Sequence, residues 1–89
     1  MVQSLQLVVY SLEFCPNCDI LKEYLKNMKI SYTERDLSSA ESLTELRING
    51  VFVQEAPVLQ RGSMFLTSAE LFQAGSLRKD QVRKMIEGS

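Results

Sequence analysis

Two cysteines, Cys15 and Cys18, are the residues whose type and spacing point most directly to chemistry in this chain of 89 residues. They are its only cysteines, and the sequence contains no histidine. A Cys-x-x-Cys pair suits either thiol–disulfide exchange or one half of a metal site. The elements that carry the pair help to decide between these two chemistries.

The pair lies between an expected strand and an expected helix. Leu5–Tyr10 is aliphatic and too short for a stable helix, so it predicts a buried central strand. From Pro16 onward the apolar residues recur at helical spacing and predict one buried stripe, formed by Ile20, Leu21, Tyr24, Leu25 and Met28. The cysteines therefore stand at a strand-to-helix junction.

The start of a helix favours negative charge, because its first N–H groups lack helical partners and the helix dipole is positive there. Cys15 is placed to react as a thiolate, whereas Cys18 is expected to be buried one turn into the helix and to keep its proton. Cys15 would then attack a disulfide, and Cys18 would resolve the mixed disulfide. Pro16 suits this first turn, since the N–H that proline lacks would have no helical partner.

A metal site is the alternative chemistry for the two cysteines. Structural zinc usually needs four protein ligands, and a single chain could add only carboxylates such as Asp19. A zinc ion or an iron–sulfur cluster would therefore require a dimer. The strand-to-helix position favours redox chemistry, and we expect a monomer without a bound metal.

The chain continues with a second strand and a second helix. Ile30–Leu37 predicts a weaker strand, which completes a β-α-β unit. Ser38 and Glu41 fit a capping box that opens a helix, and Asn49-Gly50 ends it. The inward-facing residues expected in this helix are Ala40, Leu43 and Leu46.

The last third of the chain predicts a hairpin and a helical region. Val58–Gln60 and Met64–Leu66 flank Arg61-Gly62-Ser63, which predicts a hairpin with a three-residue turn. Thr67 and Glu70 form another capping box. The helix that they open is expected to be interrupted at Ala74-Gly75, with apolar positions at Leu71, Phe72, Leu77, Val82, Met85 and Ile86.

These elements predict an α/β fold with the order β-α-β-α-β-β-α. The β-α-β unit makes parallel neighbours and the hairpin makes antiparallel ones, so a four-stranded mixed sheet with helices on both faces is expected. A chain of this length has room for one hydrophobic core, and we expect a single domain over residues 1–89.

Charge and hydropathy argue against two classes of partner. The net charge of −1 offers no broad positive surface for nucleic acid. Leu5–Tyr10 is the longest nearly unbroken apolar stretch, far below the roughly 20 residues of a membrane span. Met1–Ser4 lacks the basic residues that begin a secretory signal. We therefore expect a cytoplasmic protein that acts on disulfide-containing proteins, without nucleic acid or a membrane.

The sequence resembles the glutaredoxin family, which has a thioredoxin-like fold. The resemblance rests on Tyr10-Ser11, on Phe14-Cys15-Pro16-Asn17-Cys18, on Lys22 and on Ala56-Pro57-Val58. It implies a dithiol–disulfide oxidoreductase, an electron carrier for protein or small-molecule disulfides, with Cys15 and Cys18 as catalytic residues.

The resemblance also implies how substrate is bound. Pro57 is expected to follow a cis bond and face Cys15, with the Ala56 backbone bonding an extended substrate. The expected substrate-binding residues are Phe14, Pro16, Asn17, Glu55, Ala56 and Pro57. An ordinary strand-start proline is the alternative for Pro57. Phe14 fits a lip beside Cys15 or the core, and Lys22 fits a solvated surface or the groove, of which the surface is commoner.

The electron donor is the remaining question. Glutaredoxins that use glutathione typically carry a basic residue a few positions before the first cysteine, where this chain has Leu12-Glu13. Together with Glu55, Glu13 should repel anionic glutathione. Ala56–Leu59 is also similar to the glutaredoxin-like redoxins that supply ribonucleotide reductase from thioredoxin reductase, although these usually carry a Trp, which is absent here. Glutathione, another thiol reductant or a reductase are the candidate donors, with no bound cofactor expected.

Overall fold

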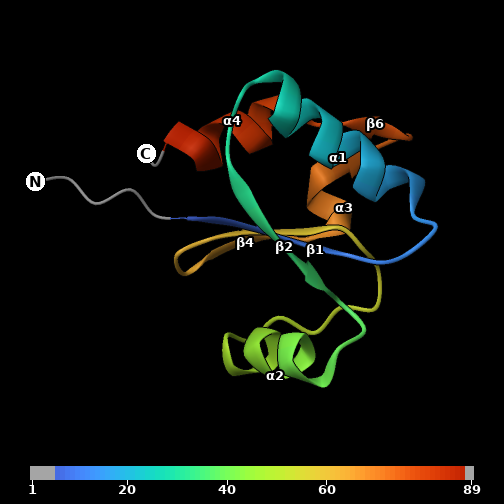
Figure 1. The fold of residues 1–89 in the computed structure, drawn as a ribbon, viewed down its shortest axis with the longest axis vertical. Coiled ribbons are helices and arrows are strands. Elements are labelled where there is room, and N and C mark those ends of the chain that lie inside the picture. Colours follow the sequence, from blue (N-terminus) through green and yellow to red (C-terminus); the bar gives the residue numbers. More distant parts are fainter. Residues whose placement is uncertain (1–5, 88–89) are drawn as a thin grey trace, which may run out of the picture.

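A computed structural model describes residues 6–87 of the chain, so Leu5 of the first predicted strand lies outside the described residues. The elements are β1 (Leu7–Ser11), α1 (Pro16–Asn27), β2 (Tyr32–Asp36), α2 (Ala40–Ile48), β3 (Val58–Arg61), β4 (Met64–Leu66), α3 (Ser68–Leu71), β5 (Phe72–Gln73), β6 (Ser76–Leu77) and α4 (Lys79–Glu87) (Figure 1). Within residues 6–87 no helix has both the length and the apolar character that crossing a membrane requires.

The main sheet has four strands in the order β2-β1-β3-β4. β1 runs parallel to β2 and antiparallel to β3, and β3 and β4 form an antiparallel hairpin. Figure 1 shows α1, α3 and α4 on one face of this sheet and α2 on the other. The predicted mixed sheet, its flanking helices and the thioredoxin-like fold are confirmed.

The sheet separates two hydrophobic clusters because side chains alternate across β1. Leu7 and Val9 point to the cluster under α1, α3 and α4, whereas Tyr10 points to the cluster under α2. The other buried residues of the first cluster are Leu21, Leu25, Leu59, Leu71, Val82 and Met85, and those of the second are Leu37, Leu46 and Val58. A strand that is buried on both faces explains the near-continuous aliphatic run.

The apolar stripe of α1 is narrower than predicted. Leu21 and Leu25 are fully buried, but Ile20 and Met28 are exposed by 43% and 48%. Met28 is the C-cap residue, so it lies at the end of the helix, where the buried stripe also ends. Ile20 lies next to Leu21 in sequence and therefore about a quarter-turn away from the buried face.

The predicted cap of α2 was wrong by one residue. The N-cap is Ser39, whose Oγ accepts a hydrogen bond of 3.0 Å from the Ser42 N–H. Ser38 instead donates both its N–H and its Oγ–H to Asp36 Oδ1. The helix consequently begins at Ala40, which is exposed rather than turned inward.

The hairpin turn is also shorter than predicted. Arg61 pairs with Met64, so the turn consists of Gly62 and Ser63 alone. Gly62 has a φ of 62°, a conformation that glycine adopts without a steric penalty at the first position of a two-residue turn. Arg61 stays in the ladder as a result.

The region after β4 forms a small hairpin where one interrupted helix was predicted. The Thr67 N–H bonds to Glu70 Oε1 at 2.9 Å as the capping box requires, but α3 already ends at Leu71. Phe72 begins β5, which pairs with β6 around Ala74 and Gly75. Both turn residues have positive φ, at 52° and 82°, which a helix cannot accommodate.

Candidate active site

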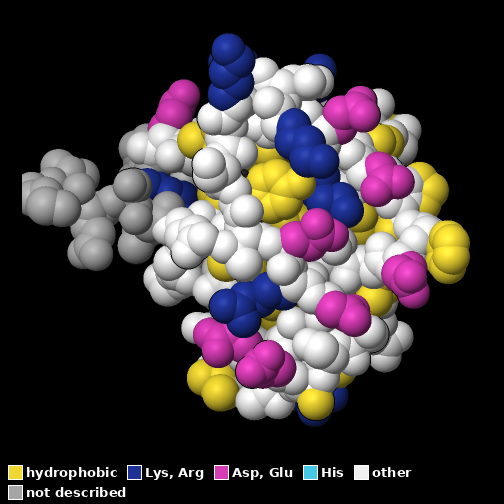
Figure 2. Space-filling view, in the orientation of Figure 1, with side chains coloured by type: hydrophobic (Ala, Val, Ile, Leu, Met, Phe, Trp, Pro, Cys, Tyr) yellow, Lys and Arg dark blue, Asp and Glu magenta, His cyan; other side chains and the backbone are white. Residues whose placement is uncertain are grey.

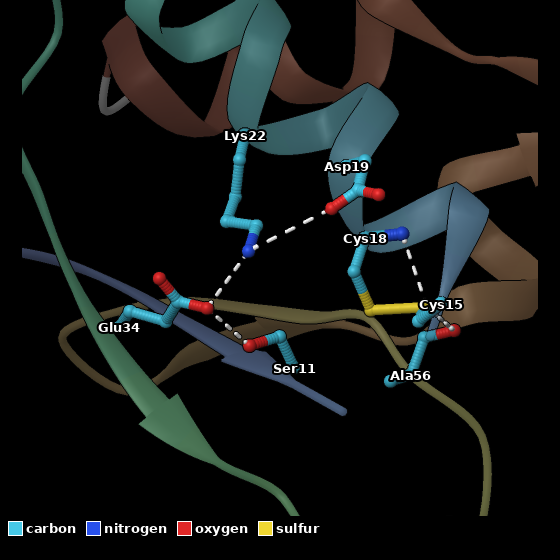
Figure 3. Close-up of a disulfide and its surroundings, with 7 residues drawn as sticks. All are labelled: Ser11, Cys15, Cys18, Asp19, Lys22, Glu34 and Ala56. Atoms are coloured by element: carbon cyan, nitrogen blue, oxygen red, sulfur yellow. Dashed lines mark hydrogen bonds and ion pairs between the residues drawn. A yellow bond between two sulfur atoms is a disulfide. The ribbon is translucent and has the colours of Figure 1, made fainter. Parts of the chain in front are cut away.

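The two cysteines are joined in a disulfide at the start of α1, with their Cα atoms 5.2 Å apart (Figure 3). Cys15 is the N-cap residue, in extended conformation, and Pro16 occupies the first turn as predicted. The Cys18 N–H donates to Cys15 Sγ over 3.1 Å. This is a free N–H of the first helical turn directed at sulfur, a contact that stabilises a thiolate once the disulfide is reduced.

The two sulfurs have different surroundings. Cys18 is fully buried, whereas Cys15 is partly exposed. The partly exposed cysteine is therefore the one at the positive end of the helix, and the buried cysteine lies within the first turn. This is the inequality expected from the sequence, and it suits one cysteine for attack and the other for resolution.

Ala56 and Pro57 are distant from this pair in sequence, but Ala56 approaches Cys15 in the structure. The bond between them is cis, as the resemblance implied, and Pro57 is buried. The Ala56 carbonyl oxygen lies 3.8 Å from Cys15 Sγ. The predicted cis bond is thus confirmed, and Pro57 directly precedes the first residue of β3, while its contact with substrate stays a prediction.

Phe14 projects into solvent immediately before Cys15. Its exposure is 97%, which rules out the core alternative. Its φ is 56°, an uncommon conformation for a bulky residue. Pro16 is exposed and Asn17 partly exposed, so three of the predicted substrate-binding residues border Cys15 on the surface.

Glu55, the remaining predicted contact, is exposed beside Ala56. It lines a shallow groove of about 340 Å³ with Val53, Gln54, Thr67, Ser68 and Ala69. Glu13 is also exposed and lines a different groove of about 690 Å³ together with Phe14 and Asp19. Two exposed acidic side chains thus lie close to the motif in sequence or next to a residue that contacts it: Glu13 precedes Cys15 by two positions, and Glu55 precedes Ala56. The wider face in Figure 2 mixes acidic and basic side chains without a broad region of one sign.

Sequence reasoning missed a polar cluster at the inner end of the larger groove. Lys22 Nζ lies 2.8 Å from Glu34 Oε2, and Ser11 Oγ–H donates to the same oxygen at 2.7 Å (Figure 3). Asp19 is a weaker partner of Lys22 at 3.9 Å. One sequence feature could have indicated this cluster. Ser11 is a polar residue at the end of an aliphatic strand, and the strand expected next to it carries the carboxylate of Glu34.

The contacts in this cluster keep both charges in place. The hydrogen bond with Glu34 raises the pKa of Lys22 above its usual value. The hydrogen bonds from Lys22 and then from Ser11 lower the pKa of Glu34. Lys22 lines the larger groove with a side chain that is 21% exposed, which favours the groove interpretation of this residue over the solvated surface.

Residues 6–87 contain no group of three or more Cys, His, Asp or Glu side chains arranged to hold a metal ion. Cys15 and Cys18 are the two thiol-bearing residues, and the structure joins them to each other. A metal site on this pair would need ligands from a second copy of the chain.

Comparison with protein families finds that the glutaredoxin family model matches residues 7–60. The matched span runs from β1 to the third residue of β3 and contains both cysteines, Ala56 and Pro57. No curated protein and no solved structure matches the chain.

Proposed function

This chain belongs to the glutaredoxin family, and we propose on that premise that it is a dithiol–disulfide oxidoreductase, an electron carrier that reduces disulfides of proteins or small molecules. The observation that supports this most directly is the placement of Cys15. Cys15 is a partly exposed residue, and its sulfur accepts the Cys18 N–H and lies beside the Ala56 carbonyl.

In the proposed reaction the reduced protein begins with a Cys15 thiolate and a Cys18 thiol. Cys15 attacks one sulfur of the substrate disulfide, which forms a mixed disulfide and releases the first substrate thiolate. Cys18 then loses its proton and attacks Cys15 Sγ, and the second substrate thiolate leaves. Two electrons pass to the substrate, and the protein ends with the Cys15–Cys18 disulfide.

We propose that the substrate lies across the surface between Phe14 and Ala56. An extended segment there would hydrogen-bond the Ala56 backbone while its disulfide approaches Cys15, and Phe14, Pro16 and Asn17 would contact its flanks. Pro57 keeps the Ala56 carbonyl beside the sulfur. Glu55 would select against negative charge at the edge of this surface.

The proposed partners are disulfide-containing proteins and a donor that restores the dithiol. A reductase or a dithiol is favoured over glutathione, because Glu13 and Glu55 are both exposed near Cys15 and glutathione is anionic. The glutaredoxin-like redoxins supplied by thioredoxin reductase for ribonucleotide reductase are the alternative within the same chemistry. We propose a monomer in the cytoplasm, where such reductants keep a dithiol reduced.

Two single substitutions test this function. Cys15→Ser should abolish reduction of a disulfide substrate, whereas Cys18→Ser should accumulate a mixed disulfide that mass spectrometry detects. Ser42→Ala, which removes a buried hydroxyl at α2, serves as the control for handling and folding. Activity of Cys15→Ser equal to the parent would refute the proposal. Zinc or iron at about half an atom per chain would instead favour a dimeric metal or iron–sulfur module.

A further inference from the structure

The ion pair between Lys22 and Glu34 has no part in the reaction described above, yet it lies in the groove beside the cysteines. Ser11 on β1 and Lys22 on α1 both bond the same oxygen of Glu34 on β2. Three elements therefore converge on one carboxylate. Because its side chain is 21% exposed and hydrogen-bonded at 2.8 Å, Lys22 holds its ammonium group at a fixed place.

Lys22 follows Cys18 by one helical turn. Residues four apart in an α-helix are neighbours on the same face. Figure 3 shows the Cys18 sulfur and the Lys22 ammonium both pointing from α1 toward the strand that carries Ser11. The fixed cation and the buried sulfur are therefore on the same side of the helix.

Cys18 needs help to ionise in the resolving step. It is fully buried, and burial opposes the formation of a charged thiolate. In the mixed disulfide the Cys18 thiol gives its proton to solvent, and the thiolate then forms the bond to Cys15 Sγ while the bond from Cys15 to the substrate sulfur breaks. A nearby cation lowers the energy of this thiolate by electrostatic attraction.

We propose that Lys22 is a positioning residue for resolution: its ammonium, fixed by Glu34 and Ser11, stabilises the Cys18 thiolate as it forms. This inference rests on the proposed function and adds a residue outside the Cys-x-x-Cys motif. Lys22 and Glu34 have opposite effects on the stability of the Cys18 thiolate. Lys22 favours the thiolate directly, while the Glu34 carboxylate opposes it and also holds the cation in place.

Other charged or titratable side chains face this region from each element that borders it. They are Glu13 in the loop before α1, Asp19 and Lys26 on α1, and Tyr32, Arg35 and Asp36 on β2. From the segment before β3 the backbone carbonyl of Ala56, which carries no net charge, approaches Cys15. These groups are unchanged when Lys22 or Glu34 is replaced, so a difference between those variants reports on the pair itself.

The test measures ionisation of Cys18 directly in a Cys15→Ser background, where Cys18 is the only thiol. Serine leaves an uncharged group at position 15, as the mixed disulfide does. The ultraviolet absorbance of the thiolate, followed against pH, gives the ionisation midpoint. Lys22→Met should raise the midpoint by about half a pH unit or more. Glu34→Gln should lower it, because glutamine can still accept a bond from Lys22 but carries no charge.

Two controls accompany these variants. Lys22→Arg should keep the midpoint near that of the background protein, and Lys84→Met should leave it unchanged because Lys84 lies on α4, outside the groove. If Lys22→Met does not fold by circular dichroism, the Glu34→Gln arm decides alone. The inference is overturned if Lys22→Met and Glu34→Gln shift the Cys18 ionisation midpoint in the same direction. It is also overturned if the Glu34→Gln shift is no larger than that of Lys84→Met. The measurement needs no turnover, so its outcome is separate from whether the parent reduces disulfides.

Discussion

Cys15 Sγ lies 3.8 Å from the carbonyl oxygen of Ala56, a residue 41 positions later in the chain. The contact exists because β3 pairs with β1, so the chain that enters β3 passes the end of β1 from which the motif loop leaves. A backbone polar group is thereby placed beside the Cys15 sulfur. It gives the surface around Cys15 a feature that an extended polypeptide can recognise.

Phe14 should contribute to substrate binding and little to stability. We expect Phe14→Ala to lower the turnover of a protein disulfide several-fold while leaving that of a small disulfide nearly unchanged. Because the side chain is 97% exposed and alanine has the same restriction at positive φ, the free energy of unfolding should change by less than about 0.5 kcal/mol. The measurements are steady-state turnover with both substrates and urea unfolding.

The matched control for Phe14 is Phe52→Ala, which removes an aromatic side chain that is 76% exposed. Phe52 borders a different groove, formed with residues of α2. Equal losses for Phe14→Ala and Phe52→Ala would show that exposed aromatic area matters in general and that Phe14 has no special place beside the sulfur.

Ser39 and Ser38 offer a direct test of the helix cap. Ser39→Ala should destabilise the protein by about 1 kcal/mol, because the Ser42 N–H loses its acceptor at the start of α2. Ser38→Ala should have a smaller effect, since Asp36 still accepts the Ser38 N–H. Urea unfolding of the two variants gives both values. A larger loss for Ser38→Ala would place the cap where the sequence pattern had predicted it.

The Lys22–Glu34 pair should make stability fall in acid. Hydrogen bonds lower the pKa of Glu34 in the folded protein. The stabilisation that ionised Glu34 gives the folded protein is therefore fully present above the pKa that this group has in the unfolded chain. It is lost as the pH falls through the lower pKa of the folded protein. Since the Glu34 side chain is 45% exposed, solvent screens the pair, and we expect less than about 1 kcal/mol.

Unfolding in urea at a series of acidic pH values measures this contribution. Glu34→Gln should show a shallower loss of stability than the parent. Glu23→Gln, which removes an exposed carboxylate elsewhere on α1, should follow the parent. Asp36 also has a lowered pKa, caused by its bonds with Ser38, and accounts for a part of the acid response that both variants retain. Identical curves for Glu34→Gln and the parent would rule out a contribution from the pair.

Most of the fold could be predicted from the sequence because the strongest sequence signals were local. The aliphatic run of β1 and the helical spacing after Pro16 fixed two neighbouring elements, and together they placed Cys15 at a helix start. The resemblance added the cis bond before Pro57, which composition alone does not reveal. Errors arose where two adjacent residues competed for one role, as Ser38 and Ser39 did for the cap of α2.

The polar cluster at Glu34 was missed for a different reason. Ser11, Lys22 and Glu34 come from three elements, and their contact depends on the register of β1 against β2. Spacing along one element contains no such information. The hairpin around Ala74 was likewise hidden, because a helix break and a tight turn have the same glycine-containing pattern.

Glutathione should be a poor electron donor for this protein. Glu13, two positions before Cys15, and Glu55, next to Ala56, are both exposed, and the two residues Leu12-Glu13 before the motif supply no basic side chain. Glutathione has a net negative charge near neutral pH, so its approach is opposed by both carboxylates. A dithiol, or thioredoxin with its reductase, should regenerate the Cys15–Cys18 dithiol faster.

Parallel turnover assays with one disulfide substrate decide the point, using glutathione plus its reductase in one and thioredoxin plus its reductase in the other. Replacing Glu13 and Glu55 together by Lys should raise the glutathione-supported rate several-fold, and added salt should raise that of the parent because it screens the repulsion. Replacing Glu23 and Glu87 together by Lys changes the net charge equally but on exposed sites of α1 and α4, and should have little effect. The parent protein could instead turn over faster with glutathione than with thioredoxin, at a rate that neither double variant changes. This result would show that the two carboxylates lie outside the path of the donor.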